Sequence, residues 1–195
     1  MLTEKSWSIL QELKKQYKFI LIGGWAIYLL TRKLKSKDID IIISIEELQK
    51  FKAENLEKND KLKKYGVKKD EIGIDIYVEY YSKLVIPVEE IKNYTIKMGG
   101  FELSSPEMLL ILKQAAYKNR WNSVKGEKDK IDVMSLVFFS NIDFDKYKTI
   151  LKKYSLAAYF SDLLKLIKNF KDYDRLDLNP REFKIRKNKI LIALL

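Results

Sequence analysis

The sequence predicts an α+β protein, with a mixed sheet and flanking helices in residues 1–103 and a helical bundle in residues 104–195. Two observations predict this class. Short apolar runs separated by glycines and polar clusters recur up to residue 103, and such runs are typical of strands. After Pro106 the apolar residues instead follow the spacing of amphipathic helices. A chain of 195 residues can form one domain or two tightly joined subdomains.

The same patterns assign each element in order. In the first part we expect helices over residues 3–16, 24–33 and 45–57, and strands over residues 18–22, 38–43, 61–67, 72–80, 94–98 and 101–103. Met98-Gly99-Gly100-Phe101 should form a hairpin turn, because adjacent glycines adopt the left-handed conformations that such turns need. In the second part we expect helices over residues 106–121, 128–139, 143–153, 155–171 and 180–193, with Val124-Lys125-Gly126 as a loop. Pro106 after Ser104-Ser105 is typical of a helix start.

The composition restricts the chemistry that the chain can perform. It contains no cysteine and no histidine. Disulfides, thiol catalysis, the usual zinc sites and imidazole acid–base chemistry are therefore excluded. Any catalysis must use carboxylates, lysines, hydroxyls and a metal ion that prefers oxygen ligands.

The net charge indicates what kind of partner the chain could have. It has 38 basic and 27 acidic residues, a formal charge of +11, which favours RNA, DNA or nucleotides. Lysine and arginine alternate with aromatic residues in the last third, as in proteins that stack on unpaired bases, although core packing explains the aromatics equally well. A lysine-rich surface can also serve solubility alone. We find no secretory signal and no apolar run long enough for a membrane span, and expect a soluble cytoplasmic protein.

A double glycine separates the first predicted strand from the following helix. Phe19-Ile20-Leu21-Ile22 is apolar and ends at Gly23-Gly24, and a helix should begin near Trp25. Glycine lets the backbone approach a bound group closely, and the free N–H groups of a helix start favour an anion. Alone, such a pair is usually only a turn.

Two carboxylates open the next predicted strand. Asp38 and Asp40 are two residues apart and so point to the same side of a strand, where they repel unless a cation neutralises them. Carboxylates of this kind suit Mg²⁺ or Mn²⁺ together with substrate phosphates. Asp75 lies in the alternating run Ile74–Val78, and three carboxylates converge if that strand pairs beside the first. Alone, an Asp-x-Asp pair is more often part of a solvated strand face.

A second set of charges lies in the predicted helical part. Lys113 and Arg120 are seven residues apart and share one helix face, with Ala116 between them. Asp129 and Asp132 share a face of the next helix and can pair with these cations and orient them. The cations could hold phosphates, or the four residues could be a salt-bridge set without a substrate role.

These motifs together resemble a known superfamily. Gly23-Gly24, Asp38-Ile39-Asp40-Ile41 and Ile74-Asp75-Ile76 are similar to the signature of the nucleotidyltransferase (DNA polymerase β-like) superfamily. The resemblance implies that Gly23 and Gly24 hold the triphosphate and that Asp38 and Asp40 bind the metals. It implies that Asp75 is a third metal ligand or the base for the incoming hydroxyl. Ser36 stands where many members place a hydroxyl near the terminal phosphate.

The second charge set resembles one branch of that superfamily. Lys113, Ala116 and Arg120 match a Lys-x-x-Ala-x-x-x-Arg pattern, and Lys128-Asp129-x-x-Asp132 is similar to an Arg-Asp-x-x-Asp pattern, with lysine replacing the arginine. Both are similar to motifs of the AbiEii-type branch, which includes toxins of toxin–antitoxin pairs. The matched motifs span residues 20–136.

We therefore expect a metal-dependent nucleotidyltransferase that moves a nucleoside monophosphate from an NTP such as ATP to a hydroxyl. The acceptor would be an RNA 3′ end, for example of a tRNA, or a protein, and the chain could be a toxin with an antitoxin. The NTP would lie between the two parts, on Gly23-Gly24, Lys113 and Arg120. The alternatives are a catalytically silent nucleotide- or RNA-binding module, and a basic RNA-binding domain in which the three carboxylates have no joint role.

Overall fold

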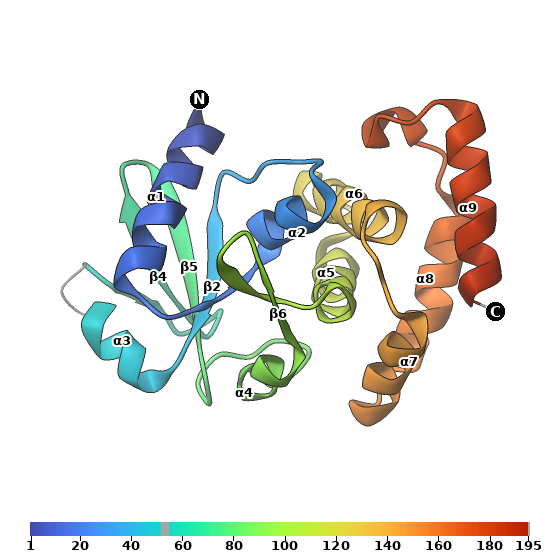
Figure 1. Cartoon of the computed structure of the whole chain (residues 1–195). Coiled ribbons are helices and arrows are strands. Elements are labelled where there is room, and N and C mark those ends of the chain that lie inside the picture. Colours follow the sequence, from blue (N-terminus) through green and yellow to red (C-terminus); the bar gives the residue numbers. More distant parts are fainter. Residues whose placement is uncertain (52–54, 195) are drawn as a thin grey trace. The chain divides into compact units, whose positions relative to one another are not determined.

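The computed structural model describes residues 1–51 and 55–194, and the chain divides into two compact units, Met1–Ser105 and Pro106–Leu195 (Figure 1). The first unit holds a mixed sheet with flanking helices, and the described residues of the second are helical and connecting segments. The predicted α+β class is thus confirmed. Among the described residues, no helix has the length and apolar character that crossing a membrane requires.

The sheet of the first unit has seven strands in the order β3-β4-β5-β2-β1-β7-β6. In chain order the strands are β1 (Ile20–Ile22), β2 (Ile39–Ile43), β3 (Glu57–Asn59), β4 (Lys64–Lys69), β5 (Ile72–Val78), β6 (Thr95–Met98) and β7 (Phe101–Ser104). The β1–β7 and β2–β5 pairs are parallel, and the other neighbouring pairs are antiparallel. The strand carrying Asp75 pairs beside the strand carrying Asp40, which meets the condition that the sequence analysis set for the carboxylates to converge.

The two faces of β5 differ in polarity, and this difference positions the site. Its buried residues alternate along the strand and point to one face of the sheet: Ile72, Ile74, Ile76 and Val78. The residues between them are only half-buried and point to the other face: Gly73, Asp75 and Tyr77. Because successive strand residues alternate between faces, a single register places every polar residue of β5 on one side.

Four α-helices occur among the described residues of the first unit: α1 (Leu2–Gln16), α2 (Gly23–Thr31), α3 (Ile45–Phe51) and α4 (Val88–Ile91). Helix α2 is apolar on several sides, with Trp25, Ala26 and Ile27 all buried, which is typical of a core helix. The indole Nε1 of Trp25 donates a buried hydrogen bond of 2.8 Å to the Ser6 hydroxyl on α1. This bond satisfies the one polar atom of the Trp25 side chain in the core.

Two local predictions of the first unit had different outcomes. The hairpin turn is confirmed, because Met98 and Phe101 are paired across Gly99 and Gly100, whose φ angles are +59° and +74°. The helix predicted over 45–57 ends at Phe51 as α3, residues 52–54 lie outside the described residues, and Glu57 belongs to β3. Strand β3 was not predicted because its three residues are polar and exposed, so it has no apolar pattern.

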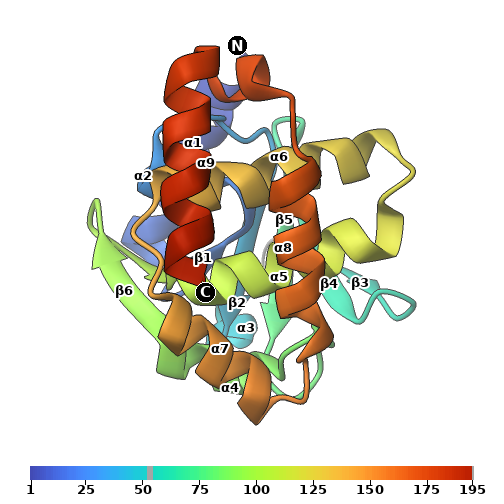
Figure 2. The same cartoon turned by 90° about the vertical axis from the view of Figure 1, so that its right-hand side faces the viewer.

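The second unit contains α5 (Pro106–Arg120), α6 (Val124–Phe139), α7 (Phe144–Lys153), α8 (Ala158–Asn169) and α9 (Pro180–Leu194). Figure 2 shows α8 and α9 running beside each other in this unit. A buried polar network joins three of its helical segments. The Gln114 side chain donates to the Tyr159 carbonyl at 2.8 Å and accepts from the Tyr147 hydroxyl at 2.5 Å. Burial raises the pKa of the Tyr147 hydroxyl, which therefore stays a neutral donor at physiological pH.

The loop predicted at Val124-Lys125-Gly126 is wrong, since these residues form the first turn of α6. Ser123 caps the helix by accepting a hydrogen bond of 3.0 Å from the Gly126 amide, and its hydroxyl donates to the Arg120 carbonyl at 2.7 Å. A Cβ atom at position 126 would lie 2.0 Å from the Arg120 carbonyl oxygen. Gly126 thus permits close backbone contact between the end of α5 and the start of α6, rather than breaking the helix.

We predict that Gly126→Ala destabilises the protein by about 1–3 kcal/mol, the usual cost of forcing extra volume into a filled site. The added methyl group would collide with backbone, which cannot rotate away as a flexible side chain can. Urea unfolding followed by circular dichroism measures the change. Val124→Ala is the matched control, because Val124 is 89% exposed in the same turn and should change stability by less than about 0.5 kcal/mol. Equal stability of the two variants would contradict the close backbone contact.

Candidate functional site

The double glycine forms the start of a helix directly after a strand. β1 ends at Ile22 and α2 begins at Gly23, and the N-cap residue Ile22 makes no side-chain cap hydrogen bond. The φ angle of Gly23 is +66°, and a Cβ atom there would lie 2.1 Å from Oδ2 of Asp40. A Cβ atom at Gly24 would lie 2.6 Å from the Ser36 hydroxyl. At both positions a neighbouring side chain lies too close to leave room for a Cβ atom, so glycine is required. The start of α2 lies against Asp40.

Asp40 and Asp75 are brought together by strand pairing. They are register partners in the parallel β2–β5 pair, so their side chains leave the same face of the sheet. Ile22, directly before Gly23, is the register partner of Asp40 on the other side of β2. The helix start and the two carboxylates consequently belong to one region of the first unit.

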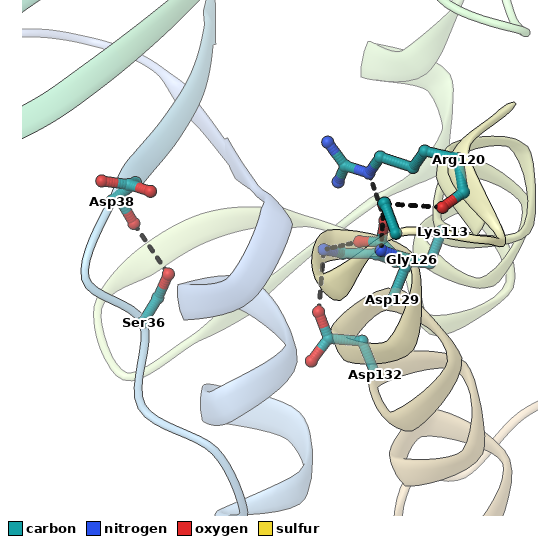
Figure 3. A network of polar contacts seen from close by, with 8 residues as sticks. Ser36, Asp38, Lys113, Arg120, Gly126, Asp129 and Asp132 are labelled. Atoms are coloured by element: carbon teal, nitrogen blue, oxygen red, sulfur yellow. Dashed lines mark hydrogen bonds and ion pairs between the residues drawn. The ribbon is translucent and has the colours of Figure 1, made fainter.

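Asp38 is exposed just before β2, next to a glycine that the sequence did not indicate. A Cβ atom at Gly73 would lie 3.5 Å from Oδ1 of Asp38, so Gly73 lies beside this carboxylate. The buried Ser36 hydroxyl donates a hydrogen bond of 2.9 Å to the Asp38 carbonyl (Figure 3). Ser36 therefore orders the segment that carries Asp38, a structural role in addition to the predicted one near a phosphate.

A lysine contacts the third carboxylate. Lys64, the first residue of β4, forms an ion pair with Oδ2 of Asp75, and its side chain is 18% exposed. β4 runs antiparallel to β5 with Gly66 opposite Asp75, so Lys64 lies on the same face. Lys64 cannot be identified from the sequence, because it stands among several lysines and only the strand pairing distinguishes it from them.

The described residues do not already form a three-carboxylate metal cluster. Among the described residues, no three acidic side chains lie close enough together to hold a metal ion. The expected convergence of Asp38, Asp40 and Asp75 on a common metal is therefore incomplete. The ion pair with Lys64 engages one oxygen of Asp75. A magnesium ion, however, is commonly held by one or two carboxylates together with substrate phosphates. Asp40, which lies against the start of α2, and Asp38, two residues before it, fit that requirement.

The charged residues predicted in the helical unit form ion pairs (Figure 3). Nζ of Lys113 lies 3.2 Å from Asp129 and 2.8 Å from Asp132, and Nε of Arg120 lies 2.6 Å from Asp129. Both carboxylate side chains are only 2% exposed, whereas that of Arg120 is 43% exposed. The predicted pairing is present, and two cations balance two buried carboxylates. That balance favours a structural role for Lys113, and phosphate binding by Lys113 and Arg120 stays a prediction.

Comparison with known proteins shows similarity in structure only. No family model matches the chain, and no curated protein matches it. The structure of JHP933 from Helicobacter pylori is similar over 98% of this chain and 93% of that chain, with 16% identity and a TM-score of 0.51. An antigenic nucleotidyltransferase-like protein from Paracoccidioides brasiliensis matches over 70% of this chain and 75% of its own, with 19% identity and a TM-score of 0.45. The likeness to JHP933 shows that the two proteins share a fold.

We predict that Lys113→Met costs about 3 kcal/mol of stability, because it leaves Asp132 buried without its cation. Urea unfolding measures the loss. Lys118→Met on the same helix is the matched control, since the Lys118–Asp162 pair is exposed on both sides and should contribute less than about 1 kcal/mol. If both variants lose the same small amount, the Lys113 cluster does not stabilise the unit.

Proposed function

We propose that the protein is a metal-dependent nucleotidyltransferase that moves a nucleoside monophosphate from an NTP to a hydroxyl acceptor. The observation that carries this proposal is the contact of Gly23, at the start of α2, with Asp40, the register partner of Asp75. An anion-binding helix start beside paired carboxylates is what a metal-bound triphosphate requires. The resemblance of these residues to the nucleotidyltransferase signature supports the same activity.

Different groups of the chain would bind different parts of the substrate. Backbone amides at Gly23 and Gly24 would bind phosphate oxygens, since the N-cap residue Ile22 makes no side-chain cap bond and the helix dipole favours an anion. Asp38 and Asp40 would hold Mg²⁺ or Mn²⁺, with Asp75 as a further ligand. When bound, the metal ion would neutralise charge on the phosphates.

We propose that Asp75 also accepts a proton. In the proposed reaction the acceptor oxygen forms a bond to the α-phosphorus, the α–β phosphoanhydride bond breaks and pyrophosphate leaves. The hydroxyl proton passes to the Asp75 carboxylate. Lys64 forms an ion pair with Oδ2 of Asp75. Either this ion pair breaks and Oδ2 accepts the proton, or Oδ1 accepts the proton while the ion pair remains.

The acceptor and the biological role are proposed from the resemblance. An RNA 3′ end, such as that of a tRNA, or a protein hydroxyl would accept the nucleotide, and the motifs around Lys113 and Asp129 support a toxin of the AbiEii type with an antitoxin. A second candidate is a catalytically silent nucleotide- or RNA-binding module. The Lys64–Asp75 ion pair favours that candidate, because Asp75 already has a cation from the protein.

Label transfer tests the proposed activity. The protein is incubated with each α-³²P-labelled NTP, Mg²⁺ or Mn²⁺, and total RNA or a protein mixture. We predict transfer that falls to background in the Asp38→Asn/Asp40→Asn variant, because the metal ligands are lost. Asp70→Asn is the matched control, since Asp70 is exposed in the turn after β4, and asparagine tolerates its φ angle of +47°. Nucleotide binding without transfer by the parent protein would support the silent module, and absence of NTP binding would contradict both candidates.

Lys64 provides a separate prediction on metal affinity. Lys64→Met should tighten Mn²⁺ binding about thirtyfold, because it removes a unit charge that would compete with the ion for Asp75, and a unit charge and a divalent ion about 4 Å apart repel each other by about 2 kcal/mol even in water. Electron paramagnetic resonance of free Mn²⁺, with a non-hydrolysable NTP present, measures the affinity. Lys61→Met is the control, since Lys61 is exposed before β4. Unchanged Mn²⁺ affinity in Lys64→Met would show that the metal does not bind near Asp75.

A further inference from the structure

A groove of ≈ 640 Å³ runs along one side of the helical unit, between faces of α5 and α8. Its volume is within the range of small-ligand sites. The α5 residues follow one helix face into the turn after it: Gln114, Tyr117, Lys118 and Trp121. The α8 residues also follow one face: Tyr159, Asp162, Lys165, Leu166 and Asn169. Both spacings are those of residues that line the same side of a helix.

Two aromatic side chains of this groove, Trp121 and Tyr117, are accessible. Trp121 is 64% exposed although it is the largest apolar side chain of the lining. Tyr117, on α5, lines the same groove and is only half-buried. The exposed Trp121 indole presents a surface on which a flat ligand can stack.

The charges of the groove leave a positive excess. Lys118 pairs with Asp162 at 3.2 Å, and Lys130 pairs with Asp172 at 3.3 Å, so both carboxylates of the lining are neutralised. Lys165 and Lys171 line the same groove, and neither forms an ion pair within the described part of the chain. Two available ammonium groups near exposed rings favour a ligand that is both aromatic and anionic.

We propose that this groove binds an unpaired segment of a single-stranded nucleic acid. A base stacks on Trp121 and Tyr117, and Lys165 and Lys171 contact the adjacent phosphates. The Asn169 amide, exposed at the groove, can hydrogen-bond to a base edge. A duplex does not fit this arrangement, since its base faces are stacked inside it. The binding of nucleic acid by this groove does not depend on the proposed transferase function. Only the role of the groove as a docking site for an RNA acceptor rests on that function.

Fluorescence anisotropy with labelled twelve-residue single strands of RNA and DNA tests the proposal, without metal or NTP. Trp121→Ala should weaken binding about tenfold, as loss of one base-stacking side chain typically does. Tyr80→Ala is the matched control, because Tyr80 is 72% exposed in the other unit and should leave the affinity unchanged. The RNA and DNA strands show which of the two binds more tightly.

The salt dependence tests the two lysines separately. The Lys165→Gln/Lys171→Gln variant should reduce the slope of log K against log salt by about 1.4, since each phosphate contact on a single strand contributes about 0.7. Lys184→Gln/Lys189→Gln on α9 removes the same charge from exposed positions outside the groove and controls for the net charge of +11. A smaller slope only in the first variant supports the site.

Two results would overturn the proposal: equal binding of duplex and single strand, or unchanged binding by Trp121→Ala. The Asp38→Asn/Asp40→Asn variant separates this proposal from the transferase activity. It should bind the strand as the parent does while transferring no nucleotide, because its changes lie in the other unit. Loss of transfer with intact binding therefore tests the transferase, and loss of binding in Trp121→Ala tests the groove.

Discussion

The parallel pairing of β2 with β5 is the constraint on which the candidate site depends. It places Asp40 opposite Asp75, and like charges directly opposite each other on a sheet are destabilising. The apolar residues on the other face fix the register, since a shift of one residue would bury a carboxylate in place of Ile41 or Ile76. The sheet therefore holds two repelling groups together, and Lys64 from β4 offsets part of that repulsion.

The part of this arrangement that could be predicted from the sequence is the part encoded locally. The run ending at Gly23, the Asp38–Asp40 spacing and the alternation around Asp75 each specify a strand end or a face. Lys64 and Gly73 could not be found in this way, because their roles depend on which strands are neighbours. Gly126 was misread for a related reason. In the local sequence, a glycine in the first turn of a helix cannot be distinguished from a glycine in a loop. The residue that requires glycine at position 126 is Arg120, whose backbone lies at the end of α5.

The lysines of the helical unit show why composition alone does not assign a role to a cation. Lys113 has a side chain only 14% exposed and lies between two buried carboxylates, so its charge is used within the protein. Lys165 and Lys171 line a groove without such partners among the residues that the structure describes, and Trp121 is exposed beside them. Sequence spacing correctly pairs Lys113 with its carboxylates, because Lys113 and Arg120 share one face of α5 and Asp129 and Asp132 share one face of α6. It does not separate a buried cation from an accessible one, which depends on how the helices pack.

The formal charges of the first unit connect its ion pair with metal binding. Three carboxylates, Asp38, Asp40 and Asp75, carry three negative charges, and Lys64 reduces the sum to two. One divalent cation would balance that remainder, whereas a triphosphate at the start of α2 adds further negative charge that the amide dipoles balance only in part. In the proposed reaction, binding of a second divalent ion would become favourable once the triphosphate is present, and that ion would compete with Lys64 for Asp75. In the proposed mechanism the lysine would hold Asp75 in place before the substrate binds and release it afterwards, so that the observed Lys64–Asp75 ion pair is compatible with the catalytic role proposed for Asp75.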